Sequence, residues 1–160
     1  MTQTEIDAAI WAEGFSPLPY QDSVGVWTIG IGYNMEAHGI PPEWVKPILE
    51  HTGITKDQAI EKLKKEWDGC ASRAATIFGS KWSSFSDAQK FVVTDMIFNM
   101  GAGNRTRGFL SFKNTIEFMK IGNWRAVCNC LKSSKWYRQV GRRAERDIRI
   151  LESNKIIKNI

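Results

Sequence analysis

Two carboxylic acids and one hydroxyl group near the start of the chain have the types and spacing that acid–base chemistry requires. Glu13 follows Ile6 and Ile10 at helical spacing, so it shares the apolar face of an expected first helix. It also falls in the last turn of that helix, and an apolar environment and a helix C-terminus both favour a protonated carboxyl group. Such a group can act as a general acid near neutral pH. With a different helix phase, Glu13 would be an ordinary surface glutamate.

Asp22 and Thr28 would supply the complementary groups. Asp22 lies in a polar turn, where a carboxylate stays ionised, and a pair of carboxyl groups in contrasting environments is typical of enzymes that cleave glycosidic bonds. Thr28 shares a strand face with Gly30 and Gly32, and these glycines leave room for a ligand or for a neighbouring backbone. Thr28 could then hold a water molecule or a substrate hydroxyl. A turn-forming aspartate and a threonine of high β-propensity are the plainer interpretations.

The elements that position these groups can be read from local patterns. Thr2 and Glu5 form a capping box for the first helix, Gly14 is its expected stop, and Pro17 and Pro19 prevent its continuation. Residues 20–35 are expected to form β structure. Within them, 22–25 form a turn, and in the strand that follows Trp27, Ile29, Ile31 and Tyr33 share one face.

The rest of the chain is expected to be helical. Pro41 and Pro42 open a helix that Pro47 should kink or end, and Thr55 with Gln58 caps a long amphipathic helix. Ser86 and Gln89 start an apolar helix that stops at Gly101. Shorter helices are expected over 111–121, 123–132 and 142–153, with a loop over 101–108. The predicted fold is α+β and mostly α, with a small N-terminal lobe (1–55), a linking helix (56–78) and a helical C-terminal lobe (79–160).

Composition and charge narrow the class of protein. Hydrophobic residues make up 42% of the chain and charged residues 24%, which excludes a disordered chain, and no apolar run is long enough for a membrane span. We also expect no secretory leader. Residues 1–100 hold 8 Lys/Arg and 13 Asp/Glu, whereas residues 101–160 hold 14 and 4. This asymmetry favours an anionic partner for the second half, in which Arg142, Arg146 and Arg149 are candidate contacts; a solvated helix face is the alternative.

Metal and disulfide chemistry is not expected. Three cysteines are an odd number, and Cys128 and Cys130, two positions apart, would face nearly opposite sides of a helix. His38 and His51 have no partner at ligand spacing. We therefore expect reduced thiols, no metal site and no cofactor.

One continuous stretch carries a family resemblance. It reads Glu13-Gly14-x5-Tyr20-x-Asp22-x2-Gly25-x2-Thr28-Ile29-Gly30-x-Gly32, and it resembles the active-site signature of the T4-type phage lysozymes, the endolysins of glycoside hydrolase family 24. Further similarity to this family lies in 54–59, 98–101, 134–137 and 143–146, so the resemblance covers nearly the whole chain.

The resemblance implies a two-lobed muramidase that cleaves the β-1,4 bond between N-acetylmuramic acid and N-acetylglucosamine, with inversion. It implies that Glu13 is the general acid, that Asp22 activates water and that Thr28 helps to hold this water. The positions that match substrate-binding residues of the family are Gly32, Phe98, Asn99, Thr115 and Lys135, and the supporting positions are Arg143, which would pair with the catalytic glutamate, Tyr33 and Gly30.

Three positions depart from the best-known member of the family. Tyr33 stands where that member has a histidine, Val24 where it has an acidic residue, and Lys135 where it has an arginine. Lysine cannot form the bidentate contact that arginine makes. These differences bear on substrate affinity, on the pH optimum and on any ion pair that involves the histidine.

The resemblance also implies partners and a setting. The expected partner is peptidoglycan, without nucleic acid or stable membrane insertion, and the expected state is a monomer. As an endolysin, the protein would remain in the host cytoplasm until a holin released it to the cell wall, where it would cause cytolysis and act as an antimicrobial. A tail lysozyme or a delivered bacterial effector would have the same sequence features.

Two other functions stay open from the sequence. A lytic transglycosylase cleaves the same bond with one acidic residue, and it leaves an anhydro sugar where a hydrolase leaves a reducing end. A non-catalytic basic protein that binds cell walls or nucleic acid would explain the charge asymmetry but not the spacing of Glu13, Asp22 and Thr28, and no nucleic-acid-reading motif is visible.

Overall fold

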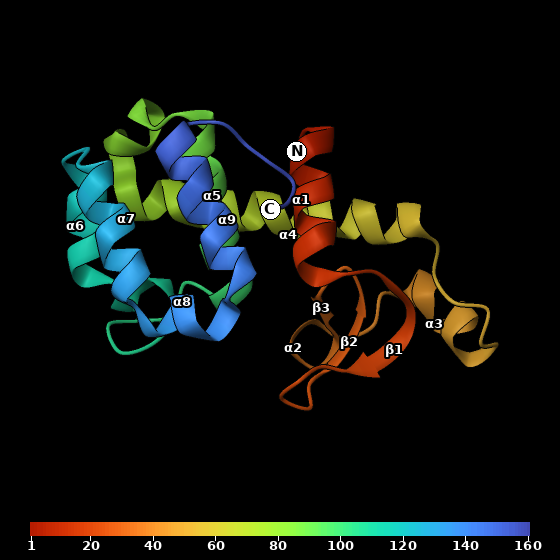
Figure 1. The fold of residues 1–160 in the computed structure, drawn as a ribbon. Coiled ribbons are helices and arrows are strands. Elements are labelled where there is room, and N and C mark those ends of the chain that lie inside the picture. The colour runs from red at the N-terminus through yellow and green to blue at the C-terminus, as the bar shows by residue number, and fades with distance from the viewer. The chain divides into compact units, whose positions relative to one another are not determined.

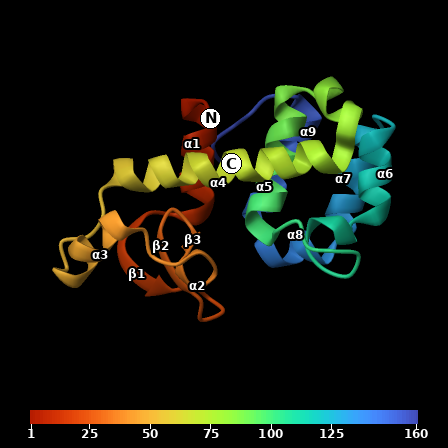
Figure 2. The same ribbon diagram turned by 180° about the vertical axis from the view of Figure 1, so that it is seen from behind.

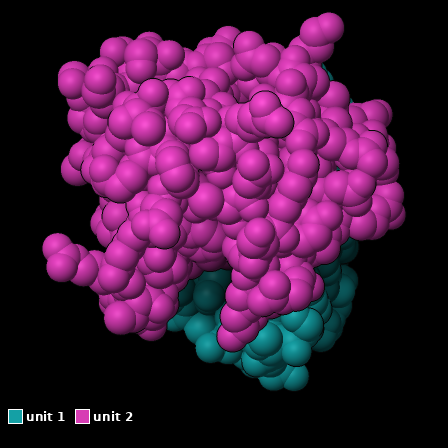
Figure 3. Space-filling model, turned by 60° about the vertical axis from the view of Figure 1, so that its left-hand side comes forward, with its two compact units in different colours: residues 1–65 teal, residues 66–160 magenta.

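The computed structural model describes residues 1–160, which form two compact units, residues 1–65 and residues 66–160 (Figure 3). Unit 1 holds the only sheet, and unit 2 is helical (Figure 1). This is the α+β, mostly α fold that the sequence predicts. The long helix α4 (Lys56–Phe78) contributes residues to both units.

Unit 1 begins with α1 (Gln3–Glu13), and its ends match the predicted signals. The Thr2 hydroxyl accepts from the Glu5 backbone N–H, while the Glu5 carboxylate accepts from the Thr2 N–H. At the other end, Gly14 adopts φ 74° and its N–H donates to the Ile10 carbonyl at 2.7 Å. Glycine tolerates this conformation without a Cβ penalty, so the helix stops directly after Glu13.

The sheet is antiparallel with the order β1 (Ser16–Gln21), β2 (Trp27–Gly30) and β3 (Tyr33–Asn34). The prolines at 17 and 19 do end the helical region, but the same segment forms strand β1, which begins four residues before the predicted β region of 20–35. β1 is an edge strand with a register irregularity between Ser16 and Tyr20. Prolines are tolerated on edge strands and at bulges because no ladder hydrogen bond is required there.

β2 and β3 are two strands and not the single run over 26–33 that the alternating pattern predicts. Gly30 and Gly32 both have positive φ, 66° and 67°, and they form the turn that joins the strands. Ile29 pairs with Tyr33 across this turn. The expected common face of Trp27, Ile29, Ile31 and Tyr33 therefore does not exist as one strand face, because the alternation of side chains ends at the turn.

The rest of unit 1 covers the sheet region (Figures 1 and 2). It comprises α2 (Met35–His38), α3 (Pro42–Leu49) and the first part of α4, which starts at the predicted capping pair Thr55 and Gln58. α3 contains Pro47 and ends two residues after it. Trp44 of α3 is buried and meets the ring of Tyr33 edge-on at 5.2 Å, which anchors α3 in the core of the unit.

Unit 2 is built around α5 (Asp87–Met100), which begins at the predicted capping box of Ser86 and Gln89. Every residue from 91 to 97 is buried, so α5 is covered on all sides and its sequence shows no polar stripe. The 3₁₀ turns η1 (Gly79–Ser84) and η2 (Phe109–Ser111) flank it, and the Gly/Arg-rich segment 101–108 is a loop, as predicted.

Four further helices surround α5 (Figure 2). They are α6 (Lys113–Lys120), α7 (Trp124–Ser133), α8 (Lys135–Val140) and α9 (Arg142–Ser153). α6, α7 and α9 confirm the predicted helices. α8 was not predicted; it is short, and its signal is the N-cap Ser134, whose hydroxyl accepts from the Tyr137 N–H at 3.0 Å.

Candidate active site

Glu13 is half-buried at the last position of α1, and its carboxyl group lies directly against Gly32. A Cβ atom built on Gly32 would stand 2.8 Å from Glu13 Oε2 and 2.9 Å from its Cδ. A side chain at position 32 would therefore displace the carboxyl group. The stop at Gly14 and the absence of a side chain at Gly32 together define where this carboxyl group can lie.

Asp22 is fixed by the turn that it starts. Its Oδ1 accepts from the backbone N–H groups of Val24 and Val26, both at 2.9 Å, and its own N–H donates to the Val26 carbonyl at 3.0 Å. Two hydrogen bonds to one carboxylate oxygen hold the side chain in one orientation. Oδ2 has no hydrogen-bond partner within the protein and remains open to a ligand or water.

Thr28 lies on β2 and is only 5% exposed. Its hydroxyl donates to the Val26 carbonyl at 3.0 Å. Because the single hydroxyl proton is used in this bond, the oxygen lone pairs can accept a hydrogen bond from water or from a substrate hydroxyl.

Tyr20 connects the three residues. It is the cross-strand partner of Thr28, so the two side chains share one face of the sheet. Burial and the negative charges of Glu13 and Asp22 raise the pKa of the Tyr20 phenol. Both carboxyl groups therefore lie within electrostatic reach of the same hydroxyl group. Tyr20 is part of the sequence motif, but the sequence alone gave no reason to assign it a role.

The supporting positions of unit 1 serve packing. A Cβ atom on Gly30 would lie 3.3 Å from the Ala59 Cβ, so here the glycine admits the neighbouring helix α4 and not a ligand. Tyr33 is 3% exposed, and its hydroxyl donates to the Gly39 carbonyl at 3.0 Å, with the His38 carbonyl at 3.3 Å. Lys62 lies over its ring at 5.2 Å.

In unit 2, the residues that match substrate-binding positions have different environments. Phe98 and Asn99 lie in the last turn of α5. The Asn99 side-chain oxygen accepts a hydrogen bond from the Trp136 indole N–H at 3.0 Å, and Phe98 is half-buried. Lys135 is exposed at the start of α8. Thr115 is only 4% exposed on α6.

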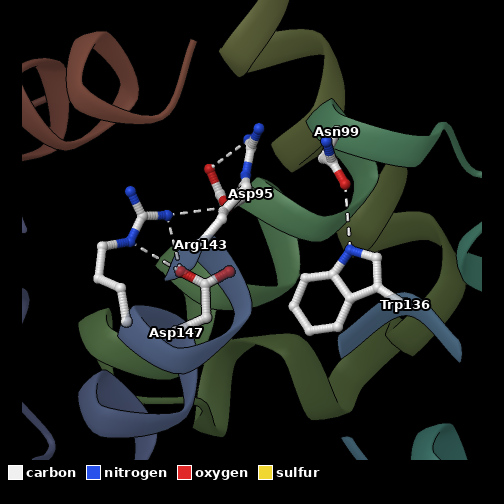
Figure 4. A network of polar contacts seen from close by, with 6 residues as sticks. Asp95, Asn99, Trp136, Arg143 and Asp147 are labelled. Carbon is white, nitrogen blue, oxygen red and sulfur yellow. Dashed lines mark hydrogen bonds and ion pairs between the residues drawn. The ribbon is translucent and has the colours of Figure 1, made fainter. Parts of the chain in front are cut away.

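Arg143 belongs to a buried ion network between α5 and α9, shown in Figure 4. Its guanidinium donates two hydrogen bonds of 2.8 Å to the Asp95 carboxylate, and Arg146 donates to Asp95 at 2.9 Å. Arg146 also donates to Asp147 Oδ1 at 2.7 and 3.0 Å. Arg146 is fully buried, so the expectation that it contacts an anionic surface is wrong.

The two acids of this network have opposite electrostatic environments. Burial disfavours charge on Asp95, but the charge and hydrogen bonds of Arg143 and the charge of Arg146 hold the pKa of Asp95 below its usual value. Burial and the charge of Asp95 raise the pKa of Asp147 well above its ordinary range. Asp147 Oδ2 is buried without a hydrogen-bond partner. The sequence did not point to Asp95, because its partners Arg143 and Arg146 lie 48 and 51 positions away on another helix.

No group of three or more His, Cys, Asp and Glu side chains is arranged to hold a metal ion. The cysteines Cys70, Cys128 and Cys130 are free thiols. Burial, followed by the charge of Glu66, raises the pKa of Cys70 to about 11, so its thiol is unreactive at neutral pH. No helix has both the length and the apolar character needed to cross a membrane.

Comparison with known proteins identifies the family of the chain. The sequence model of the phage lysozyme family matches residues 11–149. The chain is similar to two proteins of Dictyostelium discoideum, "Probable T4-type lysozyme 2", with 24% identity over 162 residues, and "Probable T4-type lysozyme 1", with 21% identity over 161 residues. Each alignment covers 92% of both chains.

The chain is mostly helical with one small sheet, and its two carboxyl groups lie at the end of α1 and in the turn after β1, which fits the lysozyme class of glycoside hydrolases. Because the family model spans most of its length, the chain belongs to the phage lysozyme family. It is a lysozyme, a hydrolase whose substrate is the peptidoglycan of bacterial cell walls.

Proposed function

We propose that this lysozyme cleaves the β-1,4 bond between N-acetylmuramic acid and N-acetylglucosamine with Glu13 as general acid and Asp22 as general base. The observation that carries the proposal is the common environment of Tyr20: its phenol senses both carboxyl groups, and it shares a sheet face with Thr28. A pair of carboxyl groups that face one bond is the usual arrangement for glycoside hydrolysis.

The proposed reaction is a single displacement. Glu13 donates its proton to the glycosidic oxygen as the bond to the anomeric carbon breaks, and a water oxygen bonds to that carbon from the opposite side. Asp22 Oδ2 takes a proton from this water, while Oδ1 stays bound to the turn N–H groups. The second hydrogen stays on the water oxygen and donates a hydrogen bond to the Thr28 oxygen, whose own proton is directed to the Val26 carbonyl. Glu13 is left ionised and Asp22 protonated, and exchange with solvent restores both.

The residues of unit 2 would bind the rest of the glycan. In this proposal Phe98, Asn99, Thr115 and Lys135 contact sugar or peptide groups, and the Trp136 indole orients the Asn99 amide. Gly32 would act on the substrate indirectly, because it admits the Glu13 carboxyl group that protonates the sugar. Arg143 is the position that the family resemblance pairs with the catalytic glutamate, and within unit 2 it donates two hydrogen bonds to Asp95.

Glu13→Gln tests the general acid. We expect the wild-type protein to clear Gram-negative cells with a permeabilised outer membrane, and the variant to lose about 10²-fold or more of this activity. Glu5→Gln on the same helix is the matched control, because glutamine also completes a capping box. Equal clearing by Glu13→Gln and Glu5→Gln would exclude Glu13 as the acid. A folded wild-type protein that clears no cells would contradict a muramidase that acts on this type of wall.

Asp22→Asn and product analysis test the rest of the mechanism. Asparagine keeps the oxygen that accepts from Val24 and Val26, so the variant removes the charge and preserves the turn. We expect activity to fall while the melting temperature changes little. A reducing-end product of inverted anomeric configuration supports the mechanism, whereas an anhydro sugar would identify a lytic transglycosylase instead.

For the biological setting we propose a phage endolysin that acts as a monomer, remains in the host cytoplasm and reaches the wall through a holin. Expression in a bacterial cytoplasm with and without a coexpressed holin tests this role. Lysis that depends on the holin is the expected result. Lysis without it would argue against holin-dependent release.

A further inference from the structure

Helices α7 and α9 lie side by side in unit 2 (Figure 1). Side chains of both helices line an open groove of about 400 Å³. The buried side chains of Cys128 and Leu151 form its base. The volume falls within the range of small-ligand sites, about 300–1,000 Å³. All of its residues belong to unit 2, whereas Glu13, Asp22 and Thr28 belong to unit 1.

Three polar side chains of α7 line this groove and have no hydrogen-bond or ion-pair partner in the protein. Trp124 is half-buried and held edge-on against Phe85 at 5.0 Å, but its indole N–H makes no hydrogen bond. The guanidinium of Arg125 is in no salt bridge, and the side-chain amide of Asn129 is unbonded. A fixed aromatic ring, a free guanidinium and a free carboxamide can recognise a sugar that carries a carboxylate and an amide.

The remaining charges of the groove favour an anionic ligand. Lys132 and Glu152 face each other across α7 and α9 and form an ion pair of 2.6 Å. Because Lys132 neutralises Glu152, Arg125 is the unpaired charge of the groove. The surrounding segment 101–160 is also strongly basic, with 14 Lys/Arg and 4 Asp/Glu, which raises the local concentration of an acidic polymer.

We propose that this groove is a second, non-catalytic binding site for the N-acetylmuramic acid units of peptidoglycan. The Arg125 guanidinium pairs with a free carboxylate of the stem peptide that the muramic acid carries, the Trp124 ring packs against the sugar face, and the Asn129 side chain hydrogen-bonds the acetamido group. The site holds the enzyme on the wall between cleavage events. This inference rests on the proposed function, because it takes the same polymer as ligand.

The first test is binding to purified cell-wall sacculi, measured by sedimentation at several salt concentrations. The Glu13→Gln background prevents degradation of the sacculi during the measurement. We expect Arg125→Glu to weaken binding about tenfold at low salt, and Arg105→Glu to weaken it less than twofold. Both changes alter the net charge equally, and Arg105 is exposed in the loop 101–108. Equal weakening by the two variants would overturn the proposal, because the effect would then be one of net charge.

The second test identifies the ligand by NMR. The indole N–H signal of Trp124, assigned by its absence in Trp124→Phe, is expected to shift with N-acetylmuramyl-L-alanyl-D-isoglutamine, whose peptide carries a free carboxylate, and much less with N-acetylglucosamine, which carries none. No shift with either sugar, or an equal response to short duplex DNA, would refute a muramic acid site. The kcat of Arg125→Glu on soluble glycan fragments should match the wild type. Inactivity of the wild-type protein on those fragments would count against the proposed function. The NMR result tests ligand binding in the groove and does not depend on catalytic activity.

Discussion

Gly32→Ala is the substitution for which the structure predicts the clearest separation of stability from activity. Position 32 has φ 67°, a conformation that costs an L-residue about 1–3 kcal/mol. In addition, the new Cβ would stand 2.8 Å from Glu13 Oε2 and 3.0 Å from its Cγ. The first effect acts on folding, and the second acts on the position of the proposed general acid.

The two effects can be estimated separately. For a chain of this size, about 1–3 kcal/mol corresponds to a drop in melting temperature of roughly 2–12 °C. The overlap with Glu13 adds little to this cost, because the end of a side chain can rotate away. A displacement of about 1 Å in a catalytic group can nevertheless lower the rate about 10²-fold. We therefore expect a folded Gly32→Ala protein with kcat/KM reduced by about 10²-fold.

Gly39→Ala is the matched control. Gly39 has φ 71°, and a Cβ atom there would meet nothing within 4 Å. Its substitution should lower the melting temperature by a similar amount and leave kcat/KM within about twofold, since only the backbone conformation is penalised. The assay pairs thermal unfolding with initial rates on soluble glycan fragments. Wild-type kcat/KM in a folded Gly32→Ala protein would refute the argument that position 32 must lack a side chain to seat the Glu13 carboxyl group.

Two further predictions concern buried polar groups. Asp147→Asn should remove a pH dependence of the free energy of unfolding. The pKa of Asp147 is raised in the folded state, so the protonated carboxyl group stabilises the fold. This stabilisation is complete at pH values below the ordinary carboxyl pKa, and it is lost as the pH rises through the raised pKa. The free energies of unfolding of wild type and variant should therefore converge at acidic pH and diverge at higher pH, by up to about 1.4 kcal/mol per pH unit in the titrating range. Parallel curves in denaturant titrations at several pH values would contradict this assignment. Thr28→Val and Thr94→Val each remove a buried hydroxyl group. The Thr28 hydroxyl donates to the Val26 carbonyl, and the Thr94 hydroxyl donates to the Lys90 carbonyl. Each substitution should lower the free energy of unfolding, measured by chemical denaturation, by about 1 kcal/mol. Only Thr28→Val should lower kcat, and an equal loss of kcat in both would mean that Thr28 has no special role in holding water.

The sequence by itself determined the features that depend on neighbouring residues. Capping pairs such as Ser86 and Gln89 act within one helical turn, so the starts of the main helices could be predicted. The spacing of Glu13, Asp22 and Thr28 also lies within one short segment, a helix end followed by a hairpin, and this segment identified both the candidate chemistry and the family.

Only the tertiary structure decided the features that depend on distant contacts. Gly32 appeared in the sequence to leave room for substrate, whereas the structure shows the Glu13 carboxyl group against it. Arg146 appeared to be a surface cation, but it is buried against Asp95, 51 positions away. Residue type states which charge a side chain carries. Its burial and its partners follow from the packing of α5 against α9, and these decide whether that charge binds a ligand or holds the core together.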